Sequence, residues 1–133
     1  MLQSASTYSK EIEGSFIGKP ELLPTKLRIA TTGQVFYIDI KEIIRIQSHS
    51  NYSKIFFTNG QTILVAKVLA HFESILCDFH FVRIHRTHVV NLNCINRFER
   101  GNIATIGLNN DEVLPVSRSK KKLLQLELKM NCC

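Results

Sequence analysis

Beyond residue 25 the chain consists of short runs in which apolar and polar positions alternate, the period expected of strands that bury one face of a sheet. Polar or glycine-containing segments separate these runs. One of them is Asn59-Gly60, whose two residues tolerate the positive φ of a tight hairpin turn. In the run 43–47, Ile44 and Ile46 are predicted to share the buried face, opposite to Arg45. Strands are predicted at residues 26–30, 34–40, 43–47, 52–58, 61–65, 79–84, 89–97, 103–108 and 112–116.

The period changes between Ala66 and Cys77, where apolar side chains recur at the spacing of one helix face. This predicts a single amphipathic helix that covers a sheet. A second helix is predicted after Ser117 or Ser119, either of which can cap its first turn. The predicted fold class is therefore mostly β, with one internal helix and one C-terminal helix. The expected packing residues of the last helix are Leu123, Leu124, Leu128 and Met130.

The length of 133 residues suits one domain with a hydrophobic core and is short for two. Residues 1–10 show no periodic apolar pattern, which predicts a frayed arm. In residues 11–24 two glycines and two prolines interrupt the apolar side chains, which predicts a lead-in without a regular element. The predicted organisation is an arm and lead-in over 1–24, one domain over 25–130 and a tail over 131–133.

The formal net charge of +6 is concentrated in one stretch of the chain. Residues 83–122 hold eight Lys or Arg against three carboxylates. A clustered charge creates a local field that attracts polyanions, whereas an evenly spread charge mainly favours solubility. The distribution therefore indicates a nucleic acid as the partner.

The four cysteines show no metal-ligand spacing, and two of them, Cys77 and Cys94, fall in apolar runs where a reduced thiol behaves as a small hydrophobe. No apolar run approaches the ~20 residues needed to cross a bilayer, and the N-terminus lacks the apolar core of a secretion signal. These features predict a cytoplasmic protein with no metal, no cofactor and no membrane contact.

The segment 116–122, Val-Ser-Arg-Ser-Lys-Lys-Lys, places four cations in the first turn of the predicted last helix. Cations beside the positive end of the helix dipole destabilise an exposed helix by roughly 0.3–1 kcal/mol each, so local stability does not account for them. A bound anion would remove the conflict, because free N–H groups and these cations all direct donors at a phosphate. The alternative is a solvated charge run that only keeps this end soluble.

A second basic segment, Arg83-Ile-His-Arg-Thr-His88, connects two predicted strands. Arg86 carries a planar donor fork that matches paired acceptors on a guanine edge, and Thr87 can bind phosphate. The alternative for Arg86 is a surface ion pair with a carboxylate such as Glu99. His85 is interpreted as a loop-supporting residue that forms hydrogen bonds inside the fold. Its spacing from His88 could suggest a metal, but no third ligand lies near.

The third candidate segment is 48–54, Ser-His-Ser-Asn-Tyr-Ser-Lys, which connects two predicted strands without glycine or proline. The Asn51 amide can pair bidentately with adenine. The alternative is an ordinary turn, since Ser and Asn side chains form such turns by bonding to nearby backbone.

Sequence signatures of catalysis are weak. The chain has no nucleophile-elbow, phosphate-loop or dinucleotide-binding glycine pattern. Cys94 with His85 or His88 could imitate a thiol nucleophile and its base, but Cys94 lies in an apolar run where a buried thiol is inert. We therefore predict a core role for Cys94 and a protein that is not an enzyme.

Several motifs, in an order and at distances that agree, resemble a LytTR DNA-binding domain, the C-terminal module of many bacterial response regulators. The resemblance covers about residues 25–128. It implies a succession of small antiparallel β-sheets around one internal helix, with loops that enter successive major grooves of bent double-stranded DNA. It also implies a transcription regulator that binds imperfect direct repeats in promoters. The motifs are Phe81–Asn91 followed by Ile95, Leu114–Arg118, Ile44-x-Ile46 and Asn51-Tyr52.

The resemblance also implies site residues, position by position. The base-contacting places of the family fall on Ser53, Arg86 and Arg118, one in each loop. Some members carry His at the place of Ser53 and Asn at that of Arg86, so their preferred bases do not transfer to this chain. His85 and Asn91 match the motif and are predicted to support the loop. Neighbouring phosphate or base contacts are implied for Asn51, Lys54, Thr87, Ser119, Lys120 and Lys121.

A typical regulator of this family carries a receiver domain ahead of the DNA-binding part, whereas about 25 residues precede it here. That length has no room for a phosphoacceptor aspartate and its sheet, and we expect a complete short protein. Its switch is then open: homodimerisation, a signalling partner protein, expression level or redox chemistry at Cys132 and Cys133 could each supply it. Two other classes also stay open, an RNA-binding module and a protein-interaction module that modulates another regulator.

Overall fold

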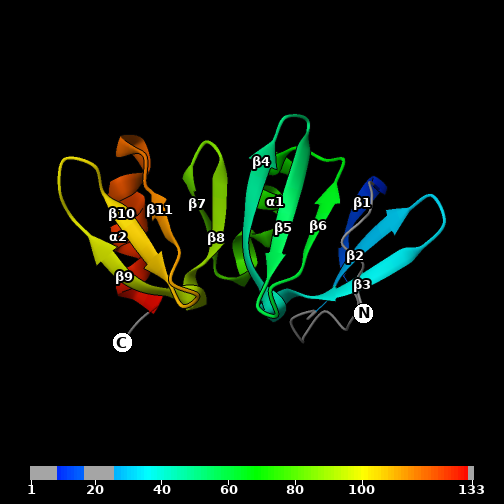
Figure 1. Cartoon of the computed structure of the whole chain (residues 1–133), viewed down its shortest axis with the longest axis horizontal. Helices are drawn as coiled ribbons and strands as arrows, with labels where there is room; N and C mark the ends of the chain where they lie inside the picture. The colour runs from blue at the N-terminus through cyan, green and yellow to red at the C-terminus, as the bar shows by residue number, and fades with distance from the viewer. Residues whose placement is uncertain (1–8, 17–25, 132–133) are drawn as a thin grey trace.

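The structure, a computed structural model, describes residues 9–16 and 26–131 of the chain. In that part, three antiparallel sheets lie side by side along the long axis of the molecule (Figure 1). A three-stranded N-terminal sheet lies at one end, a five-stranded sheet in the middle, and a third sheet with the C-terminal helix at the other end. The predicted fold class, mostly β with one internal and one C-terminal α-helix, is confirmed.

The N-terminal sheet contains β1 (Ser9–Phe16), β2 (Lys26–Thr31) and β3 (Val35–Asp39) in that order. The prediction that residues 11–24 lack a regular element is wrong for the described part, because β1 pairs with β2 along an antiparallel ladder. Such pairing satisfies the backbone N–H and C=O groups of β1 without help from its side chains. The register shifts between Ile12 and Phe16, so Gly14 lies in an irregular stretch of this ladder. The frayed arm predicted over 1–10 is wrong for residues 9 and 10, which belong to β1. The rest of that arm, 1–8, and the rest of the lead-in, 17–24, lie outside the described residues.

The strands of the central sheet are β4 (Ile43–His49), β5 (Tyr52–Phe57), β6 (Thr62–Val65), β7 (Phe81–His85) and β8 (His88–Asn91). Their order in the sheet is β6-β5-β4-β8-β7. Helix α1 (Leu69–Leu76) buries Leu69, Phe72 and Leu76 in the core that it shares with this sheet, as the helical period predicts. The 3-10 turn η2 (Cys77–Phe79) continues the helix. Asn59-Gly60 lies in the hairpin between β5 and β6, and Gly60 has the positive φ (90°) that the turn requires.

Strand β4 departs from the predicted alternation of buried and exposed residues. Its register on β5 shifts between Ile43 and Arg45, so Ile44 is an additional residue in the ladder, a β-bulge. Ile43 and Ile46 pack in the core with α1, while Ile44 packs in a second core with the third sheet. The prediction that Ile44 and Ile46 share a face is therefore wrong. Arg45, predicted on the solvent face, is only 5% exposed.

The predicted strand 89–97 is in fact two strands in two different sheets. Strand β8 ends at Asn91, the 3-10 turn η3 covers Leu92–Cys94, and β9 (Ile95–Glu99) belongs to the third sheet. The side-chain oxygen of Asn91 accepts a hydrogen bond from the Asn93 N–H (3.0 Å), a local turn that ends the ladder. The same device connects the first two sheets, where Asp39 accepts from the Lys41 N–H (3.3 Å). That bond begins the 3-10 turn η1 (Ile40–Glu42).

The third sheet consists of β9, β10 (Thr105–Leu108) and β11 (Val113–Pro115), and α2 (Arg118–Asn131) follows it. Leu124 is fully buried and Leu128 packs against the same core, as predicted. Leu123 is 42% exposed, so its predicted packing role is wrong, and the side chain of Met130 lies outside the described residues. The second core thus joins α2 and the third sheet to residues of the central sheet, including Ile84 and Val90.

Candidate nucleic-acid interface

The three candidate segments lie at one edge of the molecule. In Figure 1 the β4–β5 turn, the β7–β8 turn and the start of α2 all reach the upper edge. Backbone hydrogen bonds connect them: the Ser48 N–H donates to the Thr87 carbonyl (3.0 Å), and the Ser117 N–H donates to the Ile84 carbonyl (2.8 Å). The rigid sheet therefore holds segments that are up to about 70 residues apart in the chain next to one another.

The β7–β8 turn presents Arg86 at its tip. His85 and His88 are paired across the two strands, so Arg86 and Thr87 form a two-residue turn. Arg86 is exposed, and its guanidinium forms no ion pair with any residue that the structure describes. Glu99, the carboxylate considered as its partner, instead accepts from Arg97 at 3.1 Å. The donor fork of Arg86 is therefore available to a ligand.

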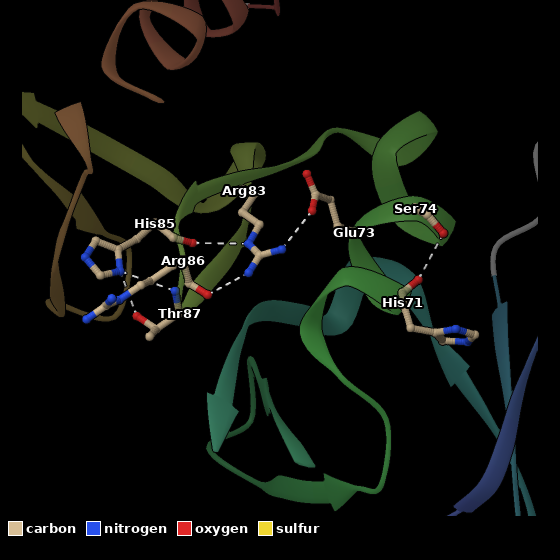
Figure 2. A network of polar contacts seen from close by, with 7 residues as sticks. All are labelled: His71, Glu73, Ser74, Arg83, His85, Arg86 and Thr87. Carbon is tan, nitrogen blue, oxygen red and sulfur yellow. Dashed lines mark hydrogen bonds and ion pairs between the residues drawn. The ribbon is translucent and has the colours of Figure 1, made fainter. Parts of the chain in front are cut away.

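The turn is braced by hydrogen bonds from inside the fold (Figure 2). The Nδ1 atom of His85 accepts from the Thr87 N–H (3.2 Å) and lies 2.9 Å from the Thr87 hydroxyl oxygen. Arg83 donates to the His85 carbonyl (3.3 Å) and to the Arg86 carbonyl (2.7 Å), and it forms an ion pair with Glu73 on α1 (3.0 Å). Sequence reasoning treated Arg83 only as part of a basic segment and missed Glu73 altogether, because the two are brought together by the packing of α1 on β7.

The turn and the start of α2 line one open surface hollow of about 470 Å³. Arg86 and Lys120 contribute cationic side chains to it, and Glu73 contributes one carboxylate. Ser117 and Ser119, the residues on either side of Arg118, also line it. Of the residues predicted for the second and third loops, Arg86, Ser119 and Lys120 thus meet at one surface of mostly positive charge. Arg118, Thr87 and Lys121 are not among its lining residues.

The first turn of α2 carries cations without local partners. Arg118 and Ser119 are exposed, Lys120 and Lys121 are half-buried, and no acidic residue lies in this turn. Over the described ranges, none of these cations is in an ion pair. The helix begins at Arg118, which leaves Ser117 in the cap position, where its hydroxyl shares a hydrogen bond with that of Ser119 (3.4 Å). Free N–H groups and cations together favour an anion at this helix start.

The β4–β5 turn is shorter than predicted. Both strands extend to leave a two-residue turn, in which Ser50 adopts a left-handed φ of 61° and Asn51 is exposed. Ser53 is fully buried, and its hydroxyl donates to the Lys67 carbonyl at 2.6 Å. This burial contradicts the base contact predicted for Ser53, because strand alternation turns its side chain toward the core. Lys54, on the opposite face, has its ammonium 5.5 Å from the centre of the Phe56 ring.

Asn91 lies away from the turn, at the end of β8, and is 3% exposed. Its amide nitrogen donates to the Ile43 carbonyl (3.0 Å), and its oxygen accepts from the Asn93 N–H. One side chain therefore joins β8 to the start of β4 and begins the turn toward the third sheet. Asn91 is therefore a structural residue of the sheet connection, and the prediction that it supports the β7–β8 loop is wrong.

A partly buried polar network between the central and third sheets was missed by sequence reasoning. Arg45 donates to both carboxylate oxygens of Glu112 (2.8 and 3.1 Å) and to the Gln47 side-chain oxygen (2.6 Å). Its guanidinium carbon lies 3.7 Å from the centre of the Phe56 ring. The hydrogen bond from Arg45 lowers the pKa of Glu112. No local signal in the sequence could have revealed this pair, because its members are 67 residues apart.

His88 lies beside this network and is 8% exposed. Burial, the charge of Arg45 and the nearby His85 lower the pKa of His88 from 6.5 to about 4. Its ring centre lies 5.7 Å from that of His85. His88 is therefore a neutral core residue near neutral pH, and the described residues include no group of three side chains suited to hold a metal.

Of the four cysteines, Cys132 and Cys133, considered for redox chemistry, lie outside the described residues. Cys77 is exposed, which differs from the small hydrophobe predicted there. Cys94 is 9% exposed and packs in the second core, and burial raises the pKa of its thiol. The core role predicted for Cys94 is confirmed. Of the helices that the structure describes, none is long and apolar enough to cross a membrane.

Comparison with known proteins defines the class of the protein. The sequence model of the LytTr DNA-binding domain matches residues 33–129, almost three quarters of the chain. The chain therefore belongs to the LytTr family and contains a DNA-binding domain of that type. The resemblance inferred from the motifs is confirmed.

A curated relative and a solved structure extend the comparison. The heme-containing CO-sensing transcriptional regulator RcoM 2 of Paraburkholderia xenovorans is 29% identical over 121 residues, which cover 88% of this chain and 44% of the relative. This chain thus spans less than half the length of that relative. The LytTr DNA-binding domain of a putative methyl-accepting/DNA response regulator from Bacillus cereus superposes with a TM-score of 0.66 at 21% identity, over 78% of this chain and 96% of that one. The fold is the same.

Proposed function

We propose that this protein regulates transcription in the cytoplasm by binding double-stranded DNA at imperfect direct repeats, with its loops in successive major grooves. The observation that carries the proposal is the common hollow lined by Arg86 and the start of α2, at the edge that the β4–β5 turn also reaches. A duplex following this edge would meet all three segments together. The protein has no catalytic role in this proposal.

Each loop has a separate task. Arg86 and Arg118 bind base edges through their planar forks, and Asn51 contacts a base or phosphate from the first turn. Thr87, Ser119, Lys120 and Lys121 bind phosphates and set the register of the protein on the duplex. Lys54 binds a phosphate beside the first turn, and Ser53 is left out because it is buried.

Selection of bound sequences from random duplexes provides the test. On the selected site, Arg86→Ala and Arg118→Ala should each lose roughly 1–3 kcal/mol of discrimination at one base pair, the value expected for a bidentate contact. The matched control is Lys129→Ala, which removes an exposed cation from the last turn of α2. It should leave base preference unchanged.

Two results would overturn the proposal. One is an Arg118→Ala variant with the affinity and base preference of the parent protein. The other is a single-stranded RNA that competes with the selected duplex at equal concentration, which would favour the RNA-binding class instead.

A further inference from the structure

Arg83 lies at the base of the β7–β8 turn, and its guanidinium has three acceptors (Figure 2). Nε donates to the His85 carbonyl (3.3 Å), one terminal nitrogen donates to the Arg86 carbonyl (2.7 Å), and the other donates to the Glu73 carboxylate (3.0 Å). The Arg83 side chain is 22% exposed. Because these bonds occupy all three of its nitrogens, Arg83 is poorly placed to serve as a free cation for DNA.

The bonded carbonyls belong to the residue before the turn and to the first residue of the turn. A planar fork that holds two successive carbonyls fixes the orientation of the two peptide units on either side of the Arg86 Cα atom. The next carbonyl, that of Thr87, accepts from the Ser48 N–H. The backbone of the turn is thus held on both sides, and the direction in which Arg86 leaves it is set by the fold.

The negative charge of Glu73 is unexpected at this place unless Glu73 serves the clamp, by which we mean Arg83 with its bonds to Glu73 and to the two carbonyls. Its carboxylate lines the same hollow as Arg86 and Lys120, where a negative charge opposes the approach of phosphate. Its ion pair with Arg83 explains its presence, because α1 thereby holds the guanidinium in the orientation that reaches both carbonyls.

We infer that Arg83, oriented by Glu73, is a positioning residue that fixes the β7–β8 turn so that Arg86 can read its base. This inference rests on the proposed base-reading role of Arg86. It predicts that the clamp contributes to discrimination between sequences and contributes little to the general attraction of DNA.

The first test replaces the fork and keeps the charge. Arg83→Lys should weaken binding to the selected site on the order of tenfold, as expected when charge-assisted hydrogen bonds are broken, and should flatten preference at the base pair that Arg86 reads. Binding to an unrelated duplex should stay the same. In the Arg86→Ala background, Arg83→Lys should have no further effect on the selected site. The control is Arg97→Lys, which alters an exposed ion pair away from the turn.

The second test uses the sign of the Glu73 effect. Glu73→Gln removes a negative charge, so a purely electrostatic role would strengthen binding to the selected site and to an unrelated duplex alike. The clamp requires the opposite for the selected site, with weaker binding there and equal or stronger binding to the unrelated duplex. Glu99→Gln, which neutralises another exposed carboxylate, serves as the control.

Hydrogen exchange in the free protein separates the clamp from the base-reading role. Arg83→Lys should speed exchange of the Thr87 and Ser48 amides, which are bonded within and across the turn, while amides in β9 and β10 keep their rates. Unchanged exchange at both amides would overturn the clamp. If exchange accelerates but Arg86→Ala leaves base preference intact, the clamp stands as a property of the turn and the proposed role of Arg86 is wrong.

Discussion

At the scale of single residues, burial assigns different roles to side chains of one type that are close in the chain. His85 and His88 are paired across the β7–β8 turn, yet His85 binds the turn while His88 faces the Arg45–Glu112 network and is nearly inaccessible. Two cations of the basic segment differ in the same way, since Arg83 is bonded inside the fold and Arg86 is open to a ligand. The number of cations in a segment therefore overstates how many can bind DNA.

The pKa of His88 predicts a pH dependence of stability. The folded protein keeps His88 neutral down to about pH 4, whereas the unfolded chain binds this proton near pH 6.5. The contribution of His88 to the free energy of unfolding should therefore have its full value above pH 6.5. It should fall as the pH decreases toward 4, by at most about 1.4 kcal/mol per pH unit.

Denaturant titrations of the parent protein, His88→Gln and His49→Gln at several pH values measure this effect. His88→Gln should flatten the fall between pH 6.5 and 4.5, while His49→Gln, which removes an exposed histidine of β4, should not. Below the usual pKa of a glutamate both variants should still lose stability. The pKa of Glu112 is lowered by its hydrogen bond with Arg45, and this carboxylate stabilises the fold only while it is ionised. An unchanged pH profile in His88→Gln would contradict the assignment.

The correction at Ser53 gives a second prediction at this scale. Ser53→Ala should lower the free energy of unfolding by about 1 kcal/mol, because the Lys67 carbonyl loses its donor in a buried place. The base preference of the protein should not change. Ser74→Ala is a matched control, since its hydroxyl bonds to the His71 carbonyl at an exposed site. A change of the preferred base in Ser53→Ala would show that Ser53 does contact DNA.

At the scale of elements, the short connections between sheets decide how the strands are distributed. Two 3-10 turns, η1 and η3, begin where Asp39 or Asn91 accepts a hydrogen bond from the N–H two residues later. Each turn sends the chain from one sheet into the next. This arrangement explains how strands of ordinary local pattern build three sheets side by side instead of one long sheet.

Variants of Asn91 test the importance of this connection. Asn91→Ala removes both of its hydrogen bonds and should cost about 1–3 kcal/mol of stability, since the Ile43 carbonyl is left buried without this donor. Asn91→Asp keeps an acceptor for the Asn93 N–H but cannot donate to Ile43 when ionised, so it should also destabilise near neutral pH. Asn96→Ala, at an exposed position of β9, should change the unfolding midpoint much less. Equal midpoints for all three would show that the turn does not depend on Asn91.

At the scale of the whole molecule, positive charge gathers at one edge of the central and third sheets, in agreement with the net charge of the sequence. The cations of the β7–β8 turn and of α2 meet there, whereas Arg45 and Arg83 are neutralised by Glu112 and Glu73. The cations that a polyanion meets at this edge are not neutralised by ion pairs with described residues of the protein.

This distribution predicts the salt dependence of DNA binding. The logarithm of the affinity should fall by ~0.9 per logarithmic unit of salt for each phosphate contact. Lys120→Ala and Lys121→Ala should each reduce this slope by ~0.9 on the selected site and on unrelated duplexes alike. Lys129→Ala, in the last turn of α2, should leave the slope unchanged. Fluorescence anisotropy titrations at four or more salt concentrations measure it, and equal slopes in all three variants would place the contacts elsewhere.

The sequence by itself determined the elements whose cause is local. Alternation over 52–58, the glycine of the Asn59-Gly60 turn and the helical stripe of α1 each depend on residues within a few positions, and the structure has them nearly as predicted. The family could also be recognised, because its motifs are short and occur in a fixed order. Arg86 could be named as a candidate because a donor fork at the end of a predicted strand is a local feature, although its exposure is not.

Only the tertiary structure decided which polar groups are neutralised and which stay open. Arg45 is buried because a β-bulge rotates it toward Glu112, 67 residues away, and the Ser53 hydroxyl donates to the carbonyl of Lys67, 14 residues away. Arg83 is held because α1 packs Glu73 beside β7. The free energy of a charge or hydroxyl depends on its surroundings in space, and partners that are distant in the chain leave no periodic signal in the sequence.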